Sequence, residues 1–342
     1  MNTRRDFLKK LGLFSIGIST VGKLQNCGIF RSPKQPNIIF IMSDDHAEKA
    51  MSCYNDSLIQ TPNIDRIARE GIRFNNSFVT NSICAPSRAV MLTGKYSHLN
   101  RLRDNREEFD GTQLTFPKLL QSNGYNTAVF GKWHLKSDPT GFDSWEVLIG
   151  QREYYNPRFK TPDGEIRETG YATDIITDKA IHWLNKRESD KPFCMLLHHK
   201  APHRNWMPPL KYLDKFDDTE FPIPATLFDD YRTREKTAGH ADMRIADMFL
   251  TFDLKLNPAD YAKQTGTGGI KKAGAPRVHY KDILNDEQRK IWDKHYDKIS
   301  KEFNNAQLQG DDLLKWKYQR YMRDYVACIL SVDDNIGRIL DY

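Results

Sequence analysis

The chain has 342 residues, of which 39% are hydrophobic and 28% are charged, so it is long enough to bury a large globular core. Its 51 basic and 45 acidic side chains give a net charge of +6. Because the two signs are interspersed and no basic patch with interleaved aromatic residues occurs, the composition argues against a nucleic-acid partner.

The first 27 residues have the pattern of an export signal. The segment MNTRRDFLKK is basic, and residues 11–21 form an apolar stretch that is too short and too rich in glycine and serine for a permanent membrane helix. Its two adjacent arginines resemble a twin-arginine signal, whose export machinery transports folded proteins. We therefore predict export to the periplasm, with residues 28–35 as a linker. If Cys27 is a lipid attachment site, the protein is instead anchored at the outer membrane.

After the linker, short apolar runs alternate with helical patterns. Residues 37–42, NIIFIM, predict a buried parallel strand that opens into Asp44 and Asp45. A helix is predicted from Pro62 to a stop at Gly71. Residues 74–80, FNNSFVT, predict a second strand.

The alternation continues through the middle of the chain. A helix over 115–122 and a strand over 126–130 precede a loop with Lys132 and His134. The segment 172–187 predicts an amphipathic helix, and KPFCMLLHHKAPH at 191–203 predicts a strand that ends in a histidine-rich loop. This order indicates an α/β fold with a doubly wound, mostly parallel sheet flanked by helices. Ligands of such sheets bind at the carboxyl ends of the strands.

The last third of the chain divides into two parts. Between about 205 and 285 the periodicity weakens, and the sequence KQTGTGGIKKAGAPR predicts a loop-rich insert. From residue 313 helical periodicity returns, with Tyr318, Tyr321, Tyr325 and Cys328 on one face.

The five cysteines favour neither a disulfide framework nor a thiolate zinc site, because their number is odd and no CxxC pair occurs. Taken alone, Cys84 is most simply a buried core thiol, and Asp44 with Asp45 a solvated turn. The hypothesis of a functional site rests on the occurrence of several reactive groups together. Acidic, thiol, basic and imidazole groups all fall in segments that should meet at one edge of the sheet.

Several motifs, in order, resemble the type I sulfatases of the alkaline-phosphatase-like superfamily. The segment CAPSR followed by AVMLTGKY matches the signature C-x-P-x-R with its downstream L-T-G-[RK]-Y. Four further segments resemble the remaining sequence blocks of the family, in the same order: NIIFIMSDDH, TPNIDRIAREGIRF, GYNTAVFGKWHL and APH. The resemblance runs from about residue 36 to residue 342, which we treat as one sulfatase catalytic domain. The loop HHKAPHRNWMPP looks most like that of bacterial N-acetylglucosamine-6-O-sulfatases.

The resemblance implies a sulfuric ester hydrolase that removes O-sulfate from a sulfated glycan, such as 6-O-sulfated N-acetylglucosamine of heparan sulfate or mucin type. In the family the signature cysteine, here Cys84, is oxidised to formylglycine by a formylglycine-generating or radical maturation enzyme. Its hydrated aldehyde is the nucleophile. The resemblance assigns calcium, with magnesium as an alternative, to Asp44, Asp45 and the modified residue 84.

The other catalytic positions follow from the same motifs. By this resemblance, Arg88 holds the hydrated aldehyde and offsets charge at the metal site. Lys132 binds both the nucleophile and a sulfate oxygen. By the same resemblance, His134 accepts the proton in the elimination step. His203 contacts the sulfate and helps to protonate the leaving oxygen. His198 and His199 match no family role. A helix from Pro86 to Leu92, capped by Gly94, should aim its N-terminal amides at the sulfate.

The sequence departs from the family pattern after VDDNIGRIL. There the family continues into a strand with an Asp-Asn/His-Gly motif, which supplies further metal ligands, and a lysine that contacts sulfate. The sequence stops at Tyr342, so we expect a truncated domain with roughly half of a metal site. Two other functions stay open. One is a phosphatase or phosphonate-ester hydrolase of the same fold, and the other is an inactive remnant or a non-catalytic glycan-binding lipoprotein.

Overall fold

The computed structural model describes residues 35–151, 153–241, 244–257 and 283–342. The chain divides into the units Met1–Pro36 and Asn37–Tyr342, and the helices and strands described below belong to the second. The predicted export signal with Cys27, nearly all of the linker, and the KQTGTGGIKKAGAPR segment lie outside the described residues. Within the described ranges, every helix is too short or too polar to cross a bilayer.

The centre of the fold is a six-stranded sheet in the order β1-β6-β2-β3-β4-β5. Four strands run parallel: β1 (Ile38–Ser43), β6 (Phe193–His199), β2 (Asn126–Lys132) and β3 (Ser144–Leu148). The antiparallel strands β4 (Arg158–Thr161) and β5 (Gly164–Arg167) extend the sheet beyond β3. The predicted α/β class with a mostly parallel sheet is therefore confirmed.

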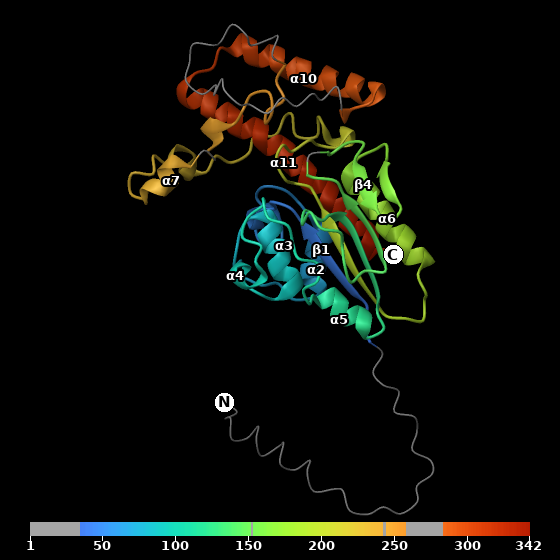
Figure 1. Cartoon of the computed structure of the whole chain (residues 1–342). Helices are drawn as coiled ribbons and strands as arrows, with labels where there is room; N and C mark the ends of the chain where they lie inside the picture. Colours follow the sequence, from blue (N-terminus) through green and yellow to red (C-terminus); the bar gives the residue numbers. More distant parts are fainter. Residues whose placement is uncertain (1–34, 152, 242–243, 258–282) are drawn as a thin grey trace, which may run out of the picture. The chain divides into compact units, whose positions relative to one another are not determined.

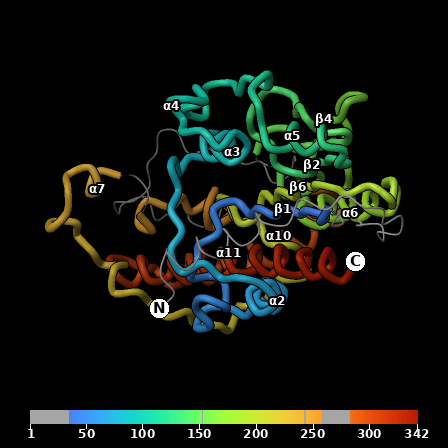
Figure 2. The backbone as a smooth tube through the Cα atoms, turned by 90° about the horizontal axis from the view of Figure 1, so that it is seen from below, coloured from blue at the N-terminus to red at the C-terminus, as the bar shows by residue number. Residues whose placement is uncertain are grey.

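Helices cover both faces of this sheet (Figure 2). The helices α3 (Cys84–Thr93) and α5 (Phe116–Ser122) lie on one face, and α6 (Ala172–Lys186) and α11 (Gly310–Leu340) on the other. Because successive side chains of a strand point to opposite faces, a separate hydrophobic cluster forms on each face of the sheet. Val129 of β2 packs in the cluster that contains residues of α3, whereas its neighbour Phe130 packs with residues of α6.

The remaining helices surround this core. The helix α2 (Pro62–Glu70) packs on α11, and α4 (Ser97–Asn100) follows α3. The helix α10 (Asp286–Ala306) begins with a capping box in which the Asn285 side chain accepts from the Gln288 amide. Figure 1 shows α10 beside the N-terminal half of α11. Short helical turns occur at η1 (Glu48–Ala50), η2 (Leu210–Tyr212), η3 (Ala225–Phe228), α7 (Lys236–His240) and η4 (Ile245–Asp247).

The strand predicted at 74–80 is wrong. These residues form no strand ladder with the described part of the chain. Phe74, Phe78 and Val79 are 68%, 90% and 73% exposed. A strand is stable only when a neighbour takes its backbone hydrogen bonds, so apolar alternation alone did not decide the conformation.

Gly131 brings β2 and β6 close together just before the strands end. Its φ is +98°, and a Cβ built there would lie 2.0 Å from the backbone oxygen of His198. Only glycine fits this approach without displacing β6. The close contact holds the end of β2 at Lys132 beside the end of β6 at His198 and His199.

Candidate active site

Three strands of the sheet end at the same edge. Ser43, the last residue of β1, pairs with His199 of β6, and Gly131 of β2 pairs with His198. The groups that follow these strands therefore meet, as the sequence predicted. Cys84, the first residue of α3, joins them from outside the sheet, and a cavity of about 200 Å³ is lined by Ser43, Asp44, Asp45, Cys84, Ser87 and Arg88, among others.

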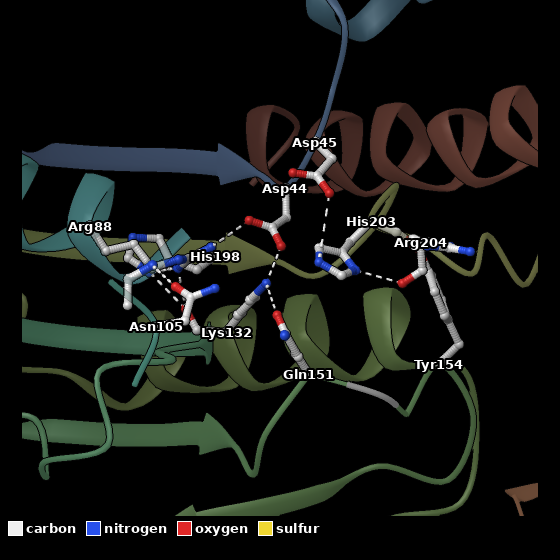
Figure 3. A network of polar contacts seen from close by, with 11 residues as sticks. Asp44, Asp45, Arg88, Asn105, Lys132, Gln151, Tyr154, His198, His203 and Arg204 are labelled. Carbon is white, nitrogen blue, oxygen red and sulfur yellow. Dashed lines mark hydrogen bonds and ion pairs between the residues drawn. The ribbon is translucent and has the colours of Figure 1, made fainter. Parts of the chain in front are cut away.

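Asp44 is the centre of a buried charge network (Figure 3). One carboxylate oxygen accepts from Lys132 Nζ, and the other accepts from Arg88 Nη2 at 3.2 Å. Burial raises the pKa of Asp44, but Lys132 and Arg88 outweigh it and hold the pKa below its usual value. Asp44 is therefore an anion at neutral pH, balanced by two cations.

Arg88 connects this network to the backbone of β2 and to β6. Its Nη1 donates to the carbonyl oxygen of Lys132 and lies 3.3 Å from His198 Nδ1. The side chain is only 2% exposed, so its guanidinium group is held in one orientation. This geometry holds the guanidinium between Asp44 and the sheet edge.

The Cys84 thiol is half-buried and protonated at neutral pH. Burial raises its pKa, and Asp44 and Asp45 raise it further, while Lys132 and Arg88 act in the opposite direction. The reactive form of a cysteine is the thiolate, which this environment disfavours. Cys84 as it stands is thus a poor nucleophile.

The helix that carries Cys84 differs from the prediction at its start. It begins at Cys84 rather than at Pro86, and ends as predicted at a left-handed Gly94. The Ala85 amide donates to Asn105 Oδ1 at 3.0 Å, Pro86 has no N–H, and the Ser87 amide donates to the Ile83 oxygen at 2.9 Å. The expectation that these amides point at a bound anion is therefore wrong.

Two histidines from different loops approach the cavity. His134 follows β2 with a φ of +59°. Burial lowers its pKa to about 4, with Lys132 and Arg88 adding to the effect, so its ring is neutral near pH 7. His203 lies in the loop after β6, with Nε2 3.6 Å from Asp45 Oδ2. Burial, Lys132 and Lys200 lower the pKa of His203, opposed by Asp44 and Asp45.

Some contacts were not expected from the sequence. Gln151 accepts from Lys132 Nζ at 2.9 Å, Asn105 accepts from the Ala85 amide, and the Tyr325 hydroxyl donates to the Asp45 carbonyl at 3.0 Å. They lie in two loops and a distant helix, where no sequence pattern singles them out. His198 and His199 were noticed without a role. His198 contacts Arg88, and the ring of His199 is wholly buried.

The cavity has ligands for a cation. A carboxylate oxygen of Asp44, Cys84 Sγ and a ring nitrogen of His203 lie within 4.8 Å of one another, and Asp45 lines the same cavity. Two carboxylates are ligands that calcium prefers, whereas a thiol is not. An oxygen in place of the Cys84 sulfur would make this donor set fit calcium or magnesium.

The structure thus brings together the predicted site residues that lie within its described ranges: Asp44, Asp45, Cys84, Arg88, Lys132, His134 and His203. They come from the ends of β1 and β2, the first half of α3 and the loop after β6.

Comparison with known proteins agrees with this arrangement. The family model for sulfatases matches residues 36–342. An N-acetylglucosamine-6-O-sulfatase of Bacteroides thetaiotaomicron is 52% identical over 90% of this chain and 55% of its own length. An ulvan-active sulfatase of Formosa agariphila is 29% identical over 61% of this chain and 44% of its own length.

Solved structures include a similar protein, BT4656, in complex with its substrate D-glucosamine-2-N,6-O-disulfate. It is 51% identical, has a TM-score of 0.82, and is matched over 90% of this chain and 62% of its own. The chain spans about half the length of the curated relatives that it matches. From its ordered motifs, its fold and these similarities, the chain belongs to the sulfatase family.

Proposed function

We propose that the protein that carries this chain removes the 6-O-sulfate from a glucosamine unit of a sulfated glycan, through a formylglycine formed at position 84. The observation that carries the proposal is the position of Cys84, which shares one cavity with Asp44, Asp45 and Arg88. The substrate class is supported by two comparisons above, with a relative named for N-acetylglucosamine 6-O-sulfate and with a solved structure bound to a 6-O-sulfated glucosamine.

The protonated thiol supports a role for Cys84 as a precursor. A thiol with a raised pKa is a weak nucleophile, and a sulfate ester is a poor electrophile. After conversion to formylglycine, the hydrated aldehyde supplies two hydroxyl groups on one carbon, of which one attacks sulfur and the other expels sulfate as the aldehyde re-forms. The maturation enzyme is therefore a required partner, and the N-terminal pattern leads us to propose export.

The surrounding side chains have complementary tasks in this scheme. Lys132, buried against Asp44, holds one sulfate oxygen and the attacking hydroxyl, and Arg88 offsets negative charge at residue 84. His203, in its protonated form, donates a proton to the sugar oxygen as the sulfur–oxygen bond breaks; because its pKa is lowered, that form is the minor one near pH 7. His134, neutral because its pKa is about 4, accepts the proton of the second hydroxyl as sulfate leaves.

Asp44 and Asp45 are the carboxylates that would hold calcium next to an oxygen of residue 84. Bound there, the ion offsets the charge of the sulfate group. The chain's own contribution is to keep Asp44 ionised, which Lys132 and Arg88 do.

The test uses protein made together with a maturation enzyme. Mass spectrometry of the peptide 82–88 should find an aldehyde in place of the thiol, and the protein should release sulfate from N-acetylglucosamine 6-sulfate in the presence of calcium. Cys84→Ala should abolish release, whereas Cys53→Ala, at another half-buried cysteine, should not.

Three outcomes would contradict the proposal. They are an unmodified thiol in active protein, full turnover by Cys84→Ala, or faster hydrolysis of the matching phosphate ester than of the sulfate ester. The last result would favour a phosphatase of the same fold.

A further inference from the structure

Lys200 carries a buried amine that the mechanism above does not use, and burial together with Lys132 lowers its pKa well below the usual lysine value. It follows directly on β6, and its side chain is 1% exposed. Among the described residues, its Nζ has no hydrogen-bond acceptor. A buried amine without an acceptor is costly, so a compensating contact is expected.

The compensating contact is an aromatic ring. Lys200 Nζ lies 3.4 Å from the ring centroid of Tyr154, which is itself wholly buried. A cation or its N–H bonds over a ring face is favourable, more so when both groups are desolvated. Tyr154 also stacks against Tyr171, with 6.0 Å between ring centroids. The ring of Tyr154 is therefore held by Lys200 and by a second aromatic residue.

The hydroxyl of Tyr154 leads to the active site. It donates to the backbone oxygen of His203 at 2.6 Å. The His203 amide in turn donates to the backbone oxygen of Lys200 at 3.1 Å. Lys200 and His203 are thus connected twice, once along the backbone turn and once through Tyr154.

Within the described part of the chain, the imidazole of His203 has two polar contacts, and the shorter one is to the next residue of its own loop. Its Nδ1 is 2.5 Å from the oxygen of Arg204, and its Nε2 is 3.6 Å from Asp45. The direction of the ring toward the cavity therefore depends on where its backbone is held.

We propose that Lys200 is a positioning residue that, by packing its amine on Tyr154, fixes the backbone of His203 for proton transfer to the leaving oxygen. This inference rests on the proposed function. It predicts that loss of either contact matters most when the leaving group needs a proton.

The experiment compares two sulfate esters in matured protein. The alcohol of N-acetylglucosamine 6-sulfate is a poor leaving group, whereas the phenol of 4-nitrophenyl sulfate leaves without a proton. Lys200→Met keeps the volume and removes the amine, and Tyr154→Phe keeps the ring and removes the hydroxyl. Each should lower kcat about tenfold on the sugar ester, with KM and the aryl-ester kcat changed less than about twofold.

The controls separate positioning from general destabilisation. Tyr155→Phe removes another buried hydroxyl, which donates to the Pro208 oxygen, so it should not change the ratio of the two kcat values. The double variant Lys200→Met/Tyr154→Phe should be no worse than either single variant, because both act on one path. Equal losses on both esters, or the same loss in Tyr155→Phe, would overturn the inference.

Failure of the proposed function gives a different result. If the matured wild type hydrolyses neither ester, that function is refuted. The link to His203 can then be measured by hydrogen exchange of peptides over residues 200–206. Lys200→Met and Tyr154→Phe should speed exchange of the His203 amide several-fold relative to Tyr155→Phe, and unchanged exchange would refute the link.

Discussion

Lys132 and Asp44 form an ion pair in which both partners are withdrawn from solvent, with 0% of the Lys132 side chain and 9% of the Asp44 side chain exposed. Asp44 follows β1 and Lys132 ends β2, and β6 lies between these strands. The pair therefore connects two strands that do not touch, at the point where the catalytic groups meet.

Lys132→Met should impair both stability and activity. Breaking a buried pair leaves the remaining charge partly uncompensated, which typically costs about 3–5 kcal/mol. Here Arg88 still offsets Asp44, so we expect the lower end of that range in urea unfolding. Sulfate release should fall at least about 100-fold. Lys95→Met, at an exposed lysine, is the control, and equal effects of both substitutions would contradict this account.

Acidification should destabilise the fold through His199. Burial lowers the pKa of His199 from 6.5 to about 4. Between these values the unfolded chain binds a proton that the folded chain does not, so stability falls as the pH drops. A group of this kind contributes a slope of about 1.4 kcal/mol per pH unit at most. In denaturation measured between pH 4.5 and 7, His199→Leu should flatten the curve, and the exposed His98→Leu should not. An unchanged slope in His199→Leu would mean that His199 titrates normally.

Asn105→Ala should loosen the start of α3. The variant leaves the Ala85 amide without the acceptor that now lies 3.0 Å away, at a typical cost of about 1 kcal/mol. Since Cys84 precedes this amide, we expect kcat to fall several-fold while KM stays similar. Asn105→Asp keeps an acceptor oxygen and should retain most of the stability. The prediction fails if Asn105→Asp loses as much stability as Asn105→Ala.

Gly131→Ala should be the most damaging small substitution in the sheet. The added Cβ would lie 2.0 Å from the His198 oxygen at a left-handed φ, so β2 and β6 must separate. We expect a loss of about 3 kcal/mol or more, measured by thermal unfolding. Gly150→Ala is the matched control, because its φ is also positive but no atom lies within 4 Å of the new Cβ. Its cost should be about 1 kcal/mol.

The sequence predicted the elements that are buried on both sides or strongly periodic. The strands at β1, β2 and β6 and the helices α2, α6 and α11 lie close to the predicted ranges. β3, β4 and β5 were missed because they are short, and the exposed positions of β5 carry no apolar alternation. The helix α10 was not predicted; it begins directly after the segment 205–285, for which the sequence predicted a loop-rich insert. Its buried face includes Trp292 and Tyr296, which pack only once the chain has folded back.

The sequence could place those site residues that lie at the end of a strand or directly after one. Asp44 and Lys132 follow apolar runs, so topology alone brings them together. Gln151 and Asn105 could not be found this way, because they reach the site from loops whose paths depend on tertiary packing. The same limit explains the mistaken start of α3. The helix begins two residues earlier than predicted, and Asn105 accepts from the amide in its first turn.

The exposed apolar side chains at 72–79 have a consequence for handling this chain. Ile72 is 79% exposed, Phe74 is 68% exposed and Phe78 is 90% exposed. Clustered exposed apolar groups promote aggregation. Concentrated solutions should therefore turn cloudy sooner as salt rises, and replacing Phe78 with lysine should delay this without a loss of helical content in circular dichroism.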